Sequence, residues 1–328
     1  MDSPVWIGID VAKASLVVAL GPDGPRTTYP NTPAGQHRLL RALAALPVAG
    51  LVLEATGAYH LALVEALQGA GYRPSVLNPQ RIHAYRRSTG KRAKNDVADA
   101  VLLARFGTQQ QPVPARIATP TEQHLRALVA RREDLVGIRT AEKTRLASER
   151  HAALARSIQA HIAWLSTQIS DLEHAIDTRI AADPALAHRR AHLLSVPGIG
   201  PVISAVLVAY LPELGELTRR QIAAIAGLAP YDADSGTHRG PRCIAGGRPL
   251  VRRALYQAVH AVSGRETALA AQRDRLKDKG NPRKLIVIAL ARRMIGIVNA
   301  MIREDLAWSQ TDVALGRVGP AVPATAAA

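Results

Sequence analysis

The long run without helix breakers between Thr121 and Asp183 constrains this chain most. It holds no proline and a single glycine, Gly137, among many Ala, Leu, Arg and Glu residues. Its second half spaces large apolar residues by three or four positions, at Ile158, Ile162, Leu165, Ile169, Leu172, Ile176 and Ile180. The spacing predicts long helices with one apolar seam, paired within one chain as a hairpin or between two chains as a dimerising coiled coil.

Strand-like and helix-like segments alternate before that run. Short apolar runs predict strands at 5–10, 15–20, 50–55 (the third strand) and 72–77. Helices are predicted at about 33–45, 59–69 and 93–106. The last helix would place Val97, Ala100, Val101 and Ala104 on one apolar face. This alternation predicts one α/β domain with a mixed sheet.

Changes of composition along the sequence divide the chain into four predicted parts. The α/β domain covers 1–110, and a proline-bearing linker with the coiled-coil helices covers 111–190. A mainly α-helical C-terminal domain covers 191–310. Residues 311–328 are predicted to be a disordered tail, because they contain few large apolar side chains.

Net charge indicates the class of partner. The chain has 42 Lys+Arg against 26 Asp+Glu, a net charge of +16, and residues 191–328 alone carry 18 basic and 10 acidic side chains. Such an excess favours a polyanion, either nucleic acid or an anionic membrane. The longest uncharged stretch, 193–212, contains Pro197 and Pro201 and so does not predict a membrane span. We therefore expect nucleic acid and no membrane as partner.

A single cysteine, Cys243, excludes an intrachain disulfide and a cysteine zinc cluster. The start MDSPVWIGID lacks the pattern of a signal peptide. Both features predict a cytoplasmic protein, which in a bacterium would be nucleoid-associated. Aromatic residues make up only 3%, with one Phe, so recognition should depend on backbone and shape more than on base stacking.

Four carboxylates carry the strongest chemical signal. Asp10 and Glu54 close two predicted strands, and Asp96 and Asp99 lie three apart on a predicted helix. Gathered in one basic domain, they would repel one another unless a cation lay among them. Oxygen ligands favour Mg²⁺ over zinc, and two such ions suit phosphodiester chemistry. The alternative is that Asp96 merely caps its helix and Asp99 is a solvated neighbour.

Two basic or glycine-bearing segments predict contacts with phosphate. Residues 193–211 have a helix–PGIG–helix pattern similar to a helix-hairpin-helix, in which Gly198 and Gly200 would expose backbone N–H groups; a plain packed turn is the alternative. Residues 81–94 hold cations and no acid before Asp96, which predicts a backbone contact or a solvated charge run. Those cations are Arg81, Arg86, Arg87, Lys91, Arg92 and Lys94.

A serine in a glycine-flanked loop is the candidate nucleophile. Ser235 precedes Gly236 and is followed by arginines with no acid until Glu266: Arg239, Arg242, Arg248, Arg252 and Arg253. A hydroxyl beside several guanidinium groups suits attack on a phosphodiester, because the arginines offset the charge that develops on phosphorus. A phosphate-binding loop without chemistry is the alternative.

These features together resemble known families. Asp10, Glu54, Asp96 and Asp99 resemble the D-E-D-D tetrad of RuvC-like nucleases of the ribonuclease-H fold. GIDVAK is also similar to the first phosphate loop of actin-like sugar kinases and chaperones, but the second, glycine-rich phosphate loop is missing from the sequence. The order of motifs, and DSGTHRG…GGRPLVRRALY above all, resembles the D-E-D-D insertion-sequence transposases, the "IS one-ten" family with bridge-RNA-guided recombinases.

That resemblance implies a specific activity. The four acids would hold Mg²⁺, Ser235 would form a transient phosphoserine with DNA, and a structured bridge RNA would pair with donor and target DNA. Dimers, or dimers of dimers, would form the active assembly. We therefore expect a mobile-element transposase that cuts and rejoins DNA. The alternatives are a RuvC-like metal-dependent nuclease without a covalent intermediate, and a non-enzymatic basic coiled-coil protein that binds DNA.

Overall fold

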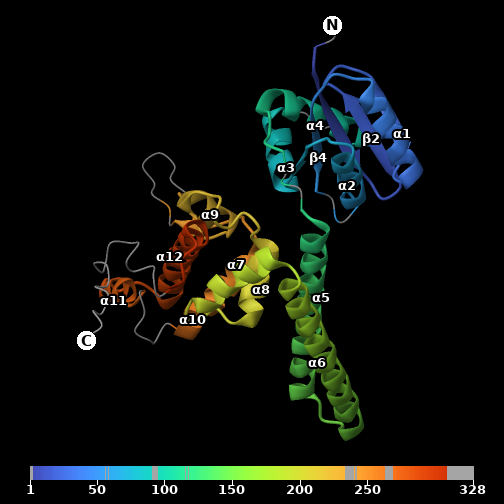
Figure 1. Cartoon of the computed structure of the whole chain (residues 1–328). Helices are drawn as coiled ribbons and strands as arrows, with labels where there is room; N and C mark the ends of the chain where they lie inside the picture. Colours follow the sequence, from blue (N-terminus) through green and yellow to red (C-terminus); the bar gives the residue numbers. More distant parts are fainter. Residues whose placement is uncertain are drawn as a thin grey trace, which may run out of the picture. The chain divides into compact units, whose positions relative to one another are not determined.

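The chain forms two compact units, residues 1–118 (unit 1) and 119–328 (unit 2) (Figure 1). The structure is a computed structural model. It describes residues 3–55, 57, 59–90, 95–114, 116, 118–232, 240, 242–262 and 269–308.

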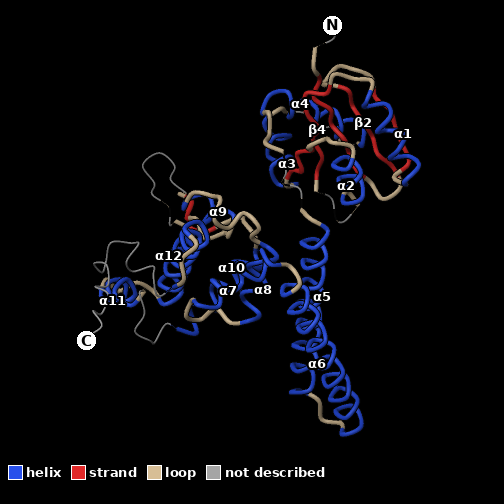
Figure 2. The backbone as a smooth tube through the Cα atoms, viewed as in Figure 1, coloured by secondary structure: helices blue, strands red, loops and turns tan. Residues whose placement is uncertain are grey.

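Unit 1 is built on a five-stranded mixed sheet with the order β3-β2-β1-β4-β5, drawn in red in Figure 2. The strands are β1 (Val5–Val11), β2 (Ser15–Leu20), β3 (Arg26–Pro30), β4 (Val48–Glu54) and β5 (Pro74–Leu77). β1, β2 and β3 pair antiparallel, whereas β4 is parallel to both β1 and β5. The predicted α/β domain with a mixed sheet is confirmed.

Helices cover both faces of this sheet. The first face packs against α1 (Pro33–Ala44) and α2 (Leu61–Gly69), and the second against α3 (Pro79–Ser88) and α4 (Asp96–Gln110). Because side chains alternate along a strand, Ile7 and Ile9 enter the core under α1 and α2. Gly8 and Asp10 therefore lie on the α4 face.

The sequence-based prediction was wrong on three points in unit 1. Residues 50–55 belong to the fourth strand, because β3 precedes them; β3 is mostly exposed and is held at the sheet edge by its pairing with β2. Helix α3 was also not predicted, since Ile82 is its one buried residue. Val97 is 46% exposed in the first turn of α4, whose buried residues include Ala100, Leu103 and Ala104.

The close approach of β1 to α4 requires glycine at position 8. A Cβ added there would lie 2.1 Å from the carbonyl oxygen of Ala100 and 2.3 Å from the amide nitrogen of Ala104. Neither backbone atom can move without displacing α4.

We expect Gly8→Ala to lower the free energy of unfolding by about 3 kcal/mol, because overpacking against backbone has no flexible side chain to absorb it. Urea unfolding followed by circular dichroism measures the change. The matched control is Gly69→Ala, where an added Cβ meets nothing within 4 Å. Equal stability of the two variants would contradict this account of the β1–α4 contact.

Unit 2 begins with a helical hairpin of α5 (Pro120–Ser148) and α6 (Ala152–Ala181). A capping box between Thr119 and Glu122 starts α5. The two helices are antiparallel, because residues near the start of α5 contact residues near the end of α6. The side-chain contacts are Arg179–Thr121, Arg132–Glu173, Arg139–Ser166 and His161–Glu142.

The apolar seam of α6 packs against α5 of the same chain. Leu165, Ile169, Ile176 and Ile180 are buried, and Leu165 and Ile169 pack against Leu135 of α5. This is the hairpin arrangement, so a coiled coil between two chains stays a prediction.

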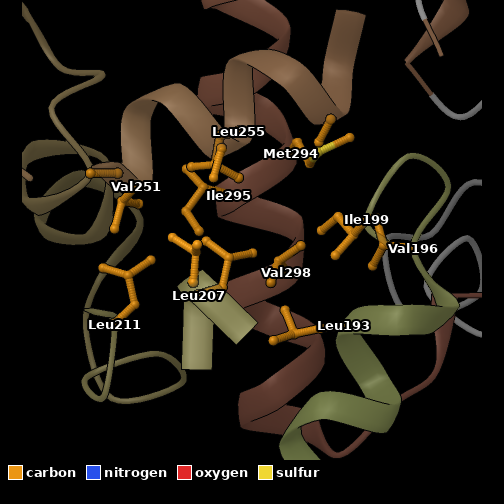
Figure 3. Close-up of a cluster of buried hydrophobic side chains, with 14 of the residues drawn as sticks. Leu193, Val196, Ile199, Leu207, Leu211, Val251, Leu255, Met294, Ile295 and Val298 are labelled. Atoms are coloured by element: carbon orange, nitrogen blue, oxygen red, sulfur yellow. The ribbon is translucent and has the colours of Figure 1, made fainter. Parts of the chain in front are cut away.

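The rest of unit 2 is mainly helical, as predicted. It contains α7 (Pro184–Ser195), α8 (Pro201–Tyr210), α9 (Arg219–Ile225), α10 (Pro249–Val262), α11 (Ala270–Asp278) and α12 (Arg283–Glu304), with the short strands β6 (Pro230–Tyr231) and β7 (Cys243–Ile244). Figure 3 shows its core, where Leu193 and Ile199 meet Leu207, Leu255 and Val298.

Helix α12 alone among the described helices is long and apolar enough to cross a membrane by length and composition. Its apolar residues, including Leu290, Met294, Ile295 and Val298, are buried in the core of unit 2. This burial is that of a core helix in a globular protein.

Candidate functional site

Two strand ends bring Asp10 and Glu54 to one edge of the sheet. β1 and β4 are parallel and paired in the register Ile9↔Leu53, so Asp10 and Glu54 follow side by side. Val52, which alternates with Leu51 and Leu53, packs with residues of α3 and α4, so Glu54 shares the α4 face with Asp10. The pleat of two parallel strands thus positions two acids together.

Helix α4 begins at the same place and supplies two more acids. Asp96 is its first residue and Asp99 lies in its first turn. The N-cap is Asn95, whose side-chain oxygen accepts a 2.7 Å hydrogen bond from the amide of Ala98. The alternative that Asp96 merely caps the helix is therefore wrong. Acidic groups in the first turn are also favoured by the helix dipole.

The other three acids act electrostatically on Asp10. The pKa of Asp10 is raised from 3.8 to about 6, first by burial and then by the negative charges of Asp99, Asp96 and Glu54, while Arg86 lowers it. The structure therefore places all four predicted residues at one end of the sheet, within electrostatic range of Asp10. We refer to Asp10, Glu54, Asp96 and Asp99 as the carboxylate tetrad.

Arg86 is the countercharge that the sequence did not assign to this site. Its guanidinium group, on α3, lies 2.6 Å from a carboxylate oxygen of Asp99, and the two side chains are only 15% and 20% exposed. The sequence placed Arg86 in a run of phosphate-binding cations. Within that run, Arg81 lies over the ring of Phe106 and Arg87 is exposed on α3.

The carboxylate tetrad fits a hard divalent cation. Its donors are all carboxylate oxygens, the type that Mg²⁺ and similar ions prefer. Burial first, and then the negative charges of the other three acids, disfavour the ionised form of Asp10, and Arg86 offsets them only in part. A bound divalent ion would offset those negative charges.

The predicted helix-hairpin-helix segment forms α7, the PGIG turn and α8. Gly198 has φ +88°, and a Cβ there would lie 2.4 Å from the carbonyl oxygen of Ala258 on α10. Gly198 is thus needed for the turn and for its packing. Gly200 is the N-cap of α8, where an added Cβ would meet nothing within 4 Å. Phosphate binding at this helix start stays a prediction.

Two of the predicted phosphate-binding arginines make contacts inside unit 2. Arg248 donates to both carboxylate oxygens of Glu213, at 2.6 and 2.7 Å, and to the carbonyl of Tyr210 at 2.7 Å. Burial opposes ionisation of Glu213, but Arg248 outweighs it and keeps the pKa of Glu213 below its usual value. Arg252 donates to the carbonyls of Gly227 and Gly246.

The remaining arginine contacts lie on more open surface. Arg242 is 71% exposed and pairs with Asp232 at 2.5 Å, and Arg253 pairs with Glu133 of α5. A role for these arginines at DNA stays a prediction.

Some predicted site residues lie outside the described part of the chain: Ser235, Arg239, Lys91, Arg92 and Lys94, together with the predicted tail. The ends of the segment that carries Ser235 are described. Pro230 pairs with Ile244 and Tyr231 with Cys243, so β6 and β7 hold the two ends of residues 232–242 side by side. We call residues 232–242 the serine-bearing segment.

Comparison with known families covers most of the chain. Residues 7–149 match a D-E-D-D family described as "Transposase". Residues 190–291 match the family described as "Transposase IS116/IS110/IS902 family". The first match contains the carboxylate tetrad, and the second contains α8, both short strands and the serine-bearing segment.

Similar proteins match over nearly their full length. The pilin gene-inverting protein of Moraxella bovis is 32% identical, over 92% of this chain and 97% of that protein. A 42 kDa protein of insertion element IS900 from Mycobacterium paratuberculosis is 25% identical, over 94% and 98% of the two chains. The solved structure of T. thermophilus RuvC with a Holliday junction substrate covers 34% of this chain and 100% of that one, at 14% identity and a TM-score of 0.26.

Proposed function

This chain belongs to the IS110 family of transposases, and from that premise we propose that it cuts and rejoins DNA through a serine nucleophile and a magnesium site. It is a DNA transposase/recombinase, which excludes the non-enzymatic DNA-binding alternative. The observation that carries the proposed chemistry is the convergence of the carboxylate tetrad from β1, β4 and α4.

The carboxylate tetrad is the proposed site of divalent metal in a RuvC-like N-terminal domain. Two Mg²⁺ ions there would stabilise the attacking and leaving oxygens of a phosphodiester. Asp10 and Glu54 are held by the sheet, and Asp99 is oriented by its 2.6 Å contact with Arg86. These rigid supports keep the carboxylates in place before DNA arrives.

Ser235 is the proposed nucleophile. Its Oγ would form a bond to phosphorus while the bond from phosphorus to the leaving sugar oxygen breaks, and the proton lost by the serine hydroxyl balances the one gained by that sugar oxygen. The reverse reaction would pass the phosphoryl group to another sugar hydroxyl, which rejoins a strand without ATP. Arg242, with its exposed guanidinium, supports the proposal because it lies at the edge of the serine-bearing segment.

The proposed partners are donor and target DNA and a structured bridge RNA, in a homodimer or dimer of dimers located in the bacterial cytoplasm at the nucleoid. The charge of +16 and the scarcity of aromatic residues favour backbone contacts, which suits a protein that leaves sequence reading to base pairing. The exposed side chains of Ile138, Leu154 and Trp164 on the hairpin offer surface to a second copy.

The test is recombination in cells that express the chain together with the DNA that flanks its coding sequence. We expect joined donor–target junctions in sequencing reads, and one RNA from the flanking DNA that co-purifies with the protein. A RuvC-like nuclease that uses water is the second candidate, since the carboxylate tetrad serves it equally. Broken ends without joined junctions would favour that nuclease, and junctions without any enriched RNA would exclude the guide.

A further inference from the structure

Three side chains with metal-binding atoms converge far from the carboxylate tetrad in the sequence. The Nε2 atom of His188 lies 2.6 Å from Oδ1 of Asp305, and Nε2 of His192 lies 2.8 Å from the same oxygen. The two Nε2 atoms are 3.2 Å apart. Within the described residues this is a compact triangle of two imidazole nitrogens and one carboxylate oxygen.

Each of the three residues is held by regular structure. His188 and His192 lie one turn apart on α7, so the helix places their rings on one face. Asp305 ends α12 in the left-handed conformation, with φ +54°. Its amide and that of Leu306 both donate to the carbonyl of Met301, which fixes the position of Asp305.

The triangle has nearly the size of a transition-metal site. With metal–ligand distances of about 2.0–2.1 Å, the ligand atoms of a tetrahedral zinc site lie about 3.3 Å apart. The two nitrogens already meet that separation, and the oxygen needs to withdraw by roughly half an ångström from each. Two imidazoles and one carboxylate favour zinc, whereas magnesium prefers oxygen ligands alone.

We propose that His188, His192 and Asp305 bind one divalent transition-metal ion of the zinc type, with water completing its coordination. The side chains of His188 and Asp305 are 62% and 70% exposed, which leaves a path for the ion, while His192 is 13% exposed and anchored in the fold. This site is separate from the proposed magnesium site and does not depend on the proposed reaction.

The ion would tie α7 to the end of α12. A further contact lies close by, because the amide of Trp308 donates a 3.0 Å hydrogen bond to Oγ of Ser195. Since α7 leads directly into the PGIG turn, a bound ion would fix the first helix of the predicted helix-hairpin-helix against the core. The metal thus has a structural role in unit 2.

The experiment is titration of the full-length, metal-stripped protein with Co²⁺ in saturating Mg²⁺, followed by visible absorption. We expect one equivalent of Co²⁺ to give the intense bands of a four-coordinate site, one equivalent of Zn²⁺ to displace it, and Zn²⁺ to raise Tm. Asp305→Asn and His192→Gln should lose these bands and the Tm shift. Asparagine tolerates the left-handed conformation, so Asp305→Asn keeps the helix end.

Controls separate this site from other ligands. His161→Gln, which removes a histidine 3.4 Å from Glu142 on the hairpin, should leave the bands unchanged. Cys243→Ser and Asp10→Asn should also keep them, which excludes the exposed thiol and the carboxylate tetrad as the source. Absence of the bands in the parent protein, or equal bands in Asp305→Asn and His192→Gln, would overturn the proposal.

Discussion

Replacing Ser235 with alanine is expected to abolish both the covalent protein–DNA adduct and strand exchange. A serine hydroxyl is not ionised at neutral pH and must be activated in place, and alanine removes the atom that is proposed to attack phosphorus. Denaturing electrophoresis with labelled DNA detects the adduct, and peptide mapping locates it. Binding of DNA should persist, because it depends on Arg and Lys side chains at phosphates and not on the serine hydroxyl.

Ser235→Cys is the informative companion, since a thiolate remains a nucleophile and would leave a trace of adduct through sulfur. Ser204→Ala is a matched control, because Ser204 is buried in α8 with its hydroxyl bound to the carbonyl of Pro201. Normal strand exchange by Ser235→Ala would exclude the serine mechanism and leave the water-using nuclease.

Removing one acid of the carboxylate tetrad is expected to cause the second large loss of activity. Asp10→Asn and Asp99→Ala should each lower DNA cleavage by at least about a hundredfold, since each removes a metal-binding carboxylate. Nucleic-acid binding should change little, because it depends on Arg and Lys at phosphates. Cleavage and gel-shift assays in Mg²⁺ measure the two effects. Full cleavage by either variant would exclude the metal site.

The same Asp10→Asn change should stabilise the metal-free protein. The pKa of Asp10 is about 6 against an ordinary 3.8, so at pH 7 the folded state carries a carboxylate that it disfavours. Removing that charge should raise the free energy of unfolding by about 1 kcal/mol, after a discount for solvent screening. The gain should be full above pH 6 and disappear as the pH falls toward 4.

Urea unfolding in EDTA at pH 7 and pH 4 checks this sign. Addition of Mg²⁺ should stabilise the parent protein and not Asp10→Asn, which reverses the order of stability. Lower stability of Asp10→Asn in EDTA at pH 7 would contradict the repulsion inferred within the carboxylate tetrad.

The sequence predicted the elements whose apolar pattern is strong. β1 and β2 are continuous apolar runs because helices cover both faces of the sheet, and α6 repeats its apolar seam from Ile158 to Ile180 because it buries one face. β3 and α3 were missed because they bury almost nothing and depend on neighbours for their structure: β3 on the edge of β2, and α3 on Ile82 and its Asn78 cap.

The carboxylates of the candidate site were predictable, but their partners were not. Asp10 and Glu54 could be placed because parallel strands end at one sheet edge. Arg86 contacts Asp99 because it lies on α3. The apolar pattern of the sequence did not predict that helix, so the pairing could not be predicted either. The His188–His192 spacing is visible in the sequence, whereas Asp305 lies 113 residues beyond His192 and meets it only when α7 packs near α12.

The pairing of β6 with β7 has an evolutionary consequence. It closes the serine-bearing segment at its base, and Arg252 braces the adjoining turn through the carbonyls of Gly227 and Gly246. Doubling the number of residues between two fixed ends costs only about 0.6 kcal/mol in closure entropy. Insertions and deletions between Tyr231 and Cys243 should therefore be almost neutral for folding. A change of length in that interval would therefore act on the proposed chemistry of the serine more than on the stability of unit 2.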